Sequence, residues 1–179
     1  MPEHLIGNGI RYSEIHDPKF RSCLLTLQFY IPRDRMTAPV HALLPDLLTA
    51  SSAAFPSVRE MTLQLESLYA ADFIAKTSLC GDAAVLEFTA SWLDDAFALD
   101  GESVTAPMLE LVTGALLHPN AENGAFCDLE FRICKQNLLD DWQAVEAAGQ
   151  DRRQHPEDRC HHLLSRGNGH ADEQYRHDQ

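Results

Sequence analysis

The 179-residue sequence lacks several features that would place it in a common functional class. It has no apolar run near the roughly 18 to 20 residues that a membrane-spanning helix needs. Its first twelve residues lack the basic and then apolar blocks of a secretory signal. It also contains no Gly-rich phosphate loop, no GxSxG motif and no internal repeat. We therefore expect a cytoplasmic protein with no membrane partner.

Basic residues are scarce: 14 Lys and Arg stand against 27 Asp and Glu, giving a formal net charge of −13. Binding the nucleic-acid backbone requires clustered Lys and Arg, so we expect no nucleic-acid partner. The same acidity favours a basic or extended peptide, attracted by long-range steering. The adjacent acids Asp94 and Asp95 point in different directions, so we expect them to form solvated surface rather than a catalytic pair.

The five cysteines form no CxxC pair, and their number is odd. Neither a disulfide framework nor a four-Cys zinc site is therefore indicated. Four of them are predicted to be small buried apolar residues: Cys23, Cys80, Cys127 and Cys134. Four aromatic residues in apolar segments are likewise predicted to be core: Phe29, Tyr30, Trp92 and Trp142.

The composition changes near residue 150. Residues 151–179 hold five of the nine histidines, and their only apolar pair is Leu163-Leu164. Such a segment buries too little surface to offset the entropy of ordering, so we predict a polar, disordered tail. Its histidines and Cys160 lack the paired spacing of a zinc site. Residues 1–150, by contrast, have the patterning of a folded domain.

Hydrophobic periodicity in residues 1–150 predicts the element order β-β-α-α-β-β-α-α. Pro45 should kink the first helix, Ser57 and Glu60 form a capping box for the second, and Gly81-Asp82 favours a hairpin. The pattern indicates an α+β fold, an antiparallel or mixed sheet with helices packed on one face. The predicted strands are 9–16, 22–31, 72–79 and 83–92, and the predicted helices are about 38–50, 57–69, 106–117 and 125–147.

Four short segments along residues 5–150 carry a family resemblance: Asn8-Gly9-Ile10-Arg11, Leu43-Leu44 through Phe55-Pro56-Ser57, Leu68-Tyr69-Ala70-Ala71 and Leu117-His118-Pro119. In their order and local sequence, these segments resemble the pitrilysin/insulinase-type metallopeptidases, which include the mitochondrial processing peptidases. The sequence is most similar to a small bacterial non-catalytic branch associated with modification of translation elongation factor P. Because family members have two longer domains, the resemblance implies an incomplete, metallopeptidase-like half-domain.

Active members of that family carry His-x-x-Glu-His on the helix predicted at 38–50, with a Glu ligand on a later helix. Two imidazoles four residues apart lie on one helical face and hold zinc, and the intervening Glu activates its water. By resemblance, these positions here are Ala42, Pro45 and Asp46, with Asn137 as the late ligand position. Ala42 offers no lone pair, Pro45 offers no base, and an amide is a poor zinc ligand. The resemblance therefore implies no catalytic residue, metal or cofactor at this site.

The leading hypothesis is a catalytically inactive homologue that acts as an interaction or partner subunit in elongation factor P modification. A peptidase-family protein or a second copy would then be its partner. One alternative is a zinc endopeptidase with a site rebuilt from His41, Asp46 and Glu130. Another is a chain truncated, or changed in frame, near residue 150 and without a function of its own.

Overall fold

The computed structural model describes residues 3–154. The chain divides into two compact units, residues 1–134 and 135–179, and the described part of the second unit is helical. Among the described residues, no helix is long and apolar enough to cross a membrane. The helices and strands are β1 (Glu3–Gly7), β2 (Ile10–Ser13), β3 (Ser22–Pro32), α1 (Ala38–Ala50), α2 (Val58–Ser67), β4 (Asp72–Cys80), β5 (Ala83–Leu93), α3 (Thr105–Leu117), β6 (Ala121–Glu122), β7 (Ala125–Phe126) and α4 (Asp128–Gln154).

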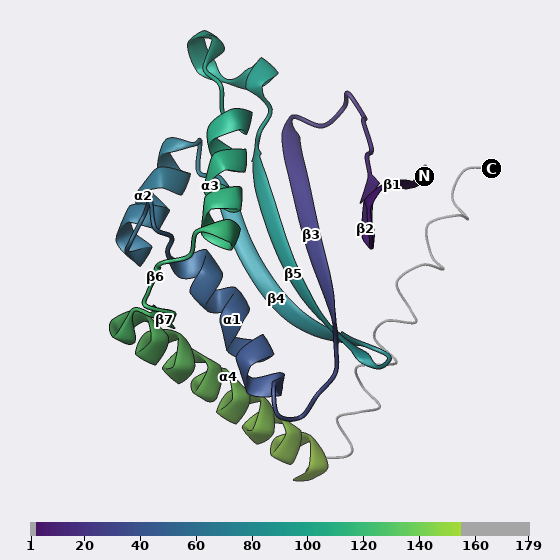
Figure 1. Cartoon of the computed structure of the whole chain (residues 1–179), viewed down its shortest axis with the longest axis vertical. Helices are drawn as coiled ribbons and strands as arrows, with labels where there is room; N and C mark the ends of the chain where they lie inside the picture. The colour runs from purple at the N-terminus through teal and green to yellow at the C-terminus, as the bar shows by residue number, and fades with distance from the viewer. Residues whose placement is uncertain (1–2, 155–179) are drawn as a thin grey trace, which may run out of the picture. The chain divides into compact units, whose positions relative to one another are not determined.

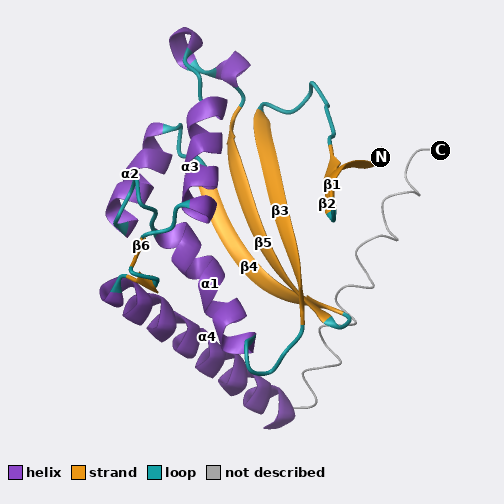
Figure 2. Ribbon diagram, viewed as in Figure 1, coloured by secondary structure: helices purple, strands orange, loops and turns teal. Residues whose placement is uncertain are grey.

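The main sheet has the strand order β3-β5-β4, and both pairs are antiparallel. Phe88 at the middle of β5 stands opposite Leu27 on β3 and Ala75 on β4. Helices α1, α2 and α3 cover one face of this sheet (Figures 1 and 2). The predicted α+β class, with helices on one face of an antiparallel sheet, is confirmed.

The core forms where alternate residues of β5 meet the apolar faces of α2 and α3. Period-two alternation sends every second side chain of a strand toward the helices, and β5 carries apolar residues at those positions. Full burial of one such side chain contributes about 1.5–3 kcal/mol. The buried cluster includes Met61, Leu68, Phe73, Leu86, Phe88, Ala90, Trp92, Val104, Met108, Leu111, Val112 and Ala115.

A row of polar side chains crosses the middle of the opposite face of the sheet, between exposed apolar residues such as Leu24 and Ile74. Lys76 Nζ on β4 lies 2.6 Å from Glu87 Oε1 on β5, and the side-chain amide of Gln28 on β3 donates to Glu87 Oε2. The hydrogen bonds from Lys76 and then Gln28 lower the pKa of Glu87. Because the Lys76 side chain is 67% exposed, water screens this ion pair, and the pair contributes little to the stability of the fold.

Two helices begin at side-chain caps. At the start of α2, the Ser57 hydroxyl accepts from the Glu60 amide at 3.2 Å and donates to the Glu60 carboxylate at 2.9 Å, which confirms the predicted cap. At the start of α3, Asp95 Oδ1 accepts from the amides of Thr105 at 2.8 Å and Val104 at 2.9 Å. The prediction that Asp95 is simply solvated surface is therefore wrong. These amide donors lower the pKa of Asp95.

The prediction for the N-terminal strand, residues 9–16, is wrong in its bounds. The chain forms a separate hairpin there, in which β1 pairs with β2 across Asn8-Gly9 and Gly9 has a φ of 79°. Asn-Gly dipeptides favour such two-residue turns because glycine tolerates a positive φ. The predicted strand overlapped only the second half of the hairpin.

The last helix also departs from its predicted bounds. It begins at Asp128, because Asn123 (φ 53°) and Gly124 (φ 79°) form a turn between β6 and β7. It ends at Gln154, seven residues beyond its predicted end at residue 147 and four beyond the predicted domain boundary at residue 150. Most of the predicted disordered tail, residues 155–179, lies outside the described residues.

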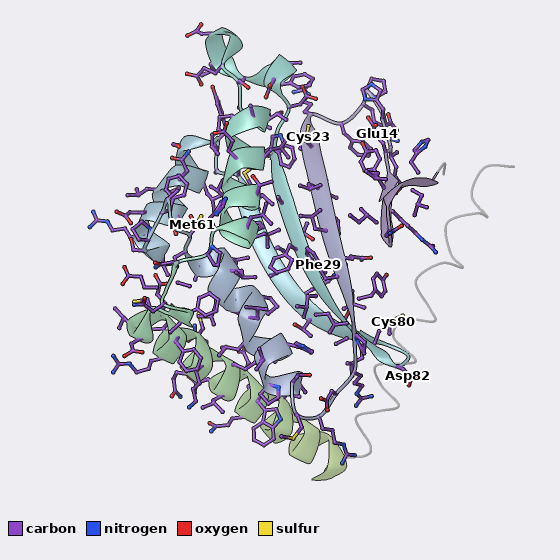
Figure 3. The ribbon with its side chains drawn as sticks, viewed as in Figure 1. Glu14, Cys23, Phe29, Met61, Cys80 and Asp82 are labelled. Carbon is purple, nitrogen blue, oxygen red and sulfur yellow. The ribbon has the colours of Figure 1, made fainter. Side chains whose placement is uncertain are left out.

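The prediction of buried cysteines holds only for Cys134. Cys23 is half-buried, and Cys80 and Cys127 are exposed. Figure 3 shows Cys80 and Asp82 at the tip of the β4–β5 hairpin, where the strands leave the core.

Among the four aromatic residues predicted to be core, only Trp92 is buried, and Trp142 on α4 is 63% exposed. Phe29 and Tyr30 are 47% and 63% exposed, respectively. Both lie on β3, an edge strand whose second edge has no neighbouring strand within the described part of the chain.

Candidate functional site

Helix α1 carries the positions that the sequence resemblance predicts to correspond to a zinc motif. Leu43 and Pro45 are buried, Ala42 is half-buried, and Asp46 is exposed. Ala42 and Asp46, four residues apart, share a helical face, but only one of them has a metal-binding atom. Asn137 is exposed and lies on the part of α4 that belongs to the second unit.

The alternative set of His41, Asp46 and Glu130 is not brought together. His41 lies in the first turn of α1, and the Glu130 carboxylate accepts from Ser51, just past the other end of the helix. Ten residues of helix separate His41 from Ser51 by about 15 Å. Within the described residues, no three His, Cys, Asp or Glu side chains lie close enough to hold one metal ion.

Glu130 is instead the acidic member of a buried polar cluster. It is 7% exposed, and Ser51 is 1% exposed. The Ser51 hydroxyl and Asn120 Nδ2, the latter at 3.3 Å, both donate to Glu130 Oε2. Asn120 Nδ2 also donates to the Pro56 carbonyl at 2.9 Å. Because Glu130 lies in the first turn of α4, the helix dipole also favours its negative charge.

This cluster joins three segments that are distant in sequence: the end of α1, the loop after α3 and the first turn of α4. Backbone hydrogen bonds run alongside it, from the Ala53 amide to the His118 carbonyl and from the Ser52 amide to the Phe55 carbonyl, both 2.9 Å long. Sequence reasoning missed the pairing of Ser51 with Glu130, because 79 positions separate them and no local spacing connects them. The cluster therefore has a structural role, because it holds these three segments together.

Cys134 lies on α4, four residues and about one helical turn after Glu130. Burial raises the pKa of its thiol, and the negative charges of Asp46 and Glu130 raise that pKa further. A thiol with a raised pKa is a poor nucleophile at neutral pH. We therefore interpret Cys134 as a packing residue on the buried side of α4.

Strand β4 lies beside the N-terminal part of α1 and is the second edge of the main sheet. The Thr77 hydroxyl on β4 donates to the His41 carbonyl at 2.9 Å, which ties the strand to the first turn of the helix. On the outer face of the same strand, Ile74 is 60% exposed. An exposed edge offers unpaired backbone amides and carbonyls to an extended peptide.

A shallow hollow lies next to the Glu130 cluster. Its lining includes Pro56, Asn120, Glu122, Phe126 and Asp128. It is partly open to solvent, and the two charged groups in its lining are acids. No small-molecule site is indicated by this shape, because ligand pockets bury most of their ligand.

No family model matches this sequence, and no curated protein matches it. Among solved structures, the chain is similar in fold to a conserved protein from Enterococcus faecalis V583, with a TM-score of 0.67 and 22% sequence identity. The match covers 71% of this chain and 30% of that one, so this chain spans less than half the length of its neighbour. A likeness at this identity shows a shared fold and carries no information on activity.

Proposed function

We propose that this chain is a catalytically inactive homologue of the pitrilysin/insulinase-type peptidases that acts as an interaction subunit and holds an extended peptide along β4. The proposal rests on one juxtaposition. An open strand edge lies against the helix whose zinc positions hold Ala42 and Pro45 in place of ligand and base. Strand addition needs backbone groups only, so it survives the loss of the metal.

The acidity of the chain supports a basic peptide as the occupant. A net charge of −13 raises the local concentration of a cationic ligand and speeds its encounter. Specific affinity then comes from the backbone ladder and from side chains on alternate positions of β4. Salt screens the attraction between the acidic chain and a basic peptide, whereas it does not screen the backbone hydrogen bonds between the peptide and β4.

The test is fluorescence anisotropy with a labelled peptide of alternating lysine and valine. Binding should weaken as salt is raised. Ile74→Lys places a positive charge beside the bound strand without touching the core, and like-charged neighbours across strands cost up to about 1 kcal/mol, or roughly fivefold in affinity. Leu24→Lys, on the outer face of β3 at 70% exposure, makes the same change in net charge on the other edge and is the matched control.

Absence of binding, or equal weakening by Ile74→Lys and Leu24→Lys, would contradict the assignment to β4. Metal analysis addresses the competing zinc endopeptidase. If the chain binds one zinc ion and cleaves peptides in a reaction that a chelator abolishes, the chain is a zinc endopeptidase and the proposed interaction role is wrong.

On the basis of the resemblance, we propose that this role belongs to the modification of elongation factor P in the cytoplasm. The direct measurement is the intact mass of elongation factor P from cells with and without this chain. A shift in mass on deletion is the expected result, and an unchanged mass would remove the pathway assignment while leaving peptide binding to be judged by itself.

A further inference from the structure

Strand β3 is a long edge strand that lacks charged protective residues along its length, and its one proline is its last residue, Pro32. Its eleven residues, Ser22–Pro32, include no charged side chain, and within the described residues it pairs only with β5. Leu24 and Tyr30 are 70% and 63% exposed on its outer face. Lysines, bulges or short length usually protect such an edge from pairing with another chain.

The sequence of β3 is complementary to itself. Antiparallel pairing of all eleven residues with a second copy places Leu27 opposite Leu27, at the twofold axis. Cross-strand partners in an antiparallel pair lie on the same face of the sheet, so Leu25 meets Phe29 on the helix face and Leu24 meets Tyr30 on the outer face. These central contacts are largely apolar, and the remaining pairs, which include Thr26 opposite Gln28, contain no charged side chain.

Strand β4, by contrast, is not complementary to itself. Full antiparallel self-pairing of Asp72–Cys80 would place Lys76 opposite Lys76, and like charges directly opposite each other are destabilising. The distribution of charge therefore selects β3, and not β4, for pairing between identical chains.

We propose that β3 is a dimerisation edge at which two copies of this chain join their three-stranded sheets into one of six strands. Eleven residues at about 3.4 Å each extend over roughly 37 Å, and a sheet about 10 Å thick gives roughly 370 Å² for each partner. A stable interface uses about 800 Å² for each partner. The dimer is therefore weak and reversible. It goes beyond the proposed peptide binding and does not rest on it.

Two other occupants fit β3 less well. A basic peptide would have no acidic side chain to pair with on β3. Residues 155–179 of the same chain contain a single apolar pair, Leu163-Leu164, and so offer no apolar strand to match eleven uncharged residues.

Sedimentation equilibrium of the full chain, from low to several hundred micromolar, tests the proposal. The average mass should rise with concentration from 20.0 kDa toward twice that value. Salt should promote the dimer, because it screens repulsion between two acidic chains, whereas it weakens binding of a basic peptide. The two interactions are thereby distinguished in one set of buffers.

Variants with two introduced charges then test which strand edge forms the dimer. Leu24→Lys/Tyr30→Lys puts lysines opposite each other across the proposed interface and should abolish the dimer. Leu24→Glu/Tyr30→Glu should do the same, and an equimolar mixture of the two variants should recover it. Ile74→Lys/Ser78→Lys makes the matched change on β4 and should leave the dimer intact. Circular dichroism checks that every variant is folded, which is expected because these four side chains are exposed.

A chain that stays monomeric at all concentrations overturns the proposal. So does a dimer that survives both variants of β3, one that the β4 variant abolishes, or a mixture that fails to restore association.

Discussion

Replacing Ser51 with alanine removes the hydroxyl that donates to the buried carboxylate of Glu130. Glu130 then keeps Asn120 as its described side-chain donor, while burial continues to exclude water from it. Hydrogen bonds to charged groups contribute about 1.5–3 kcal/mol, so we expect a loss of that size in the free energy of unfolding. For a chain of this length, 1 kcal/mol corresponds to about 2–4 °C in Tm, so the melting temperature should fall by roughly 3–12 °C.

Urea unfolding followed by circular dichroism gives the free energy, and thermal unfolding gives Tm. Ser67→Ala is the matched control, because Ser67 is exposed and its hydroxyl donates only to the Gln64 carbonyl at 2.7 Å. A surface change of this kind should stay within about 0.5 kcal/mol. Glu130→Gln and the double variant complete a cycle in which Ser51 and Glu130 should couple by about 0.5–3 kcal/mol.

The reasoning is refuted if Ser51→Ala costs no more than Ser67→Ala, or if the cycle gives no coupling. Either result would mean that Glu130 does not depend on the Ser51 hydroxyl, and that the end of α1 is held by packing alone.

Three further predictions concern other parts of the fold. The pKa of Asp95 is lowered by the Thr105 and Val104 amides, so its stabilising effect is complete above the ordinary aspartate pKa of about 3.9 and is lost as pH falls through the lowered value. Urea midpoints of Asp95→Asn should accordingly vary less with pH in that acid range than those of the unaltered chain. Met108→Ala, at a fully buried position, should cost about 2–5 kcal/mol in urea unfolding, and Leu109→Ala, at a 40% exposed one, clearly less. Cys80, which is exposed, should react with a thiol reagent in the folded chain well before Cys134, and equal rates would contradict the burial of Cys134.

Elements defined by local signals were predictable from the sequence. The bounds of α1 at 38–50 agree with the structure, as do the β4–β5 hairpin to within a residue and the start of α2 at Ser57. In each case the deciding signal lies within a few residues of the boundary: a proline near the helix start, a Gly-Asp turn, or a Ser and Glu three apart.

What depended on distant contacts was not predictable. Nothing near Glu130 indicates that its partner is Ser51, and nothing near Asp95 indicates that it caps a helix ten residues later. The burial of Phe29 was overestimated for a similar reason. Its strand has the composition of a central strand, and its edge position follows only from the order in which strands pair.

The strand order β3-β5-β4 also has a consequence for how the chain folds. The β4–β5 hairpin closes through a two-residue turn, whereas β3 must find β5 across the fifty residues 33–82 that separate the two strands. Local hairpins form in microseconds, and long-range pairing is slower because the loop entropy is lost before the contacts form. The uncharged β3 segment therefore stays exposed longest in the nascent chain, so aggregation during synthesis would begin at this strand rather than at the charged β4.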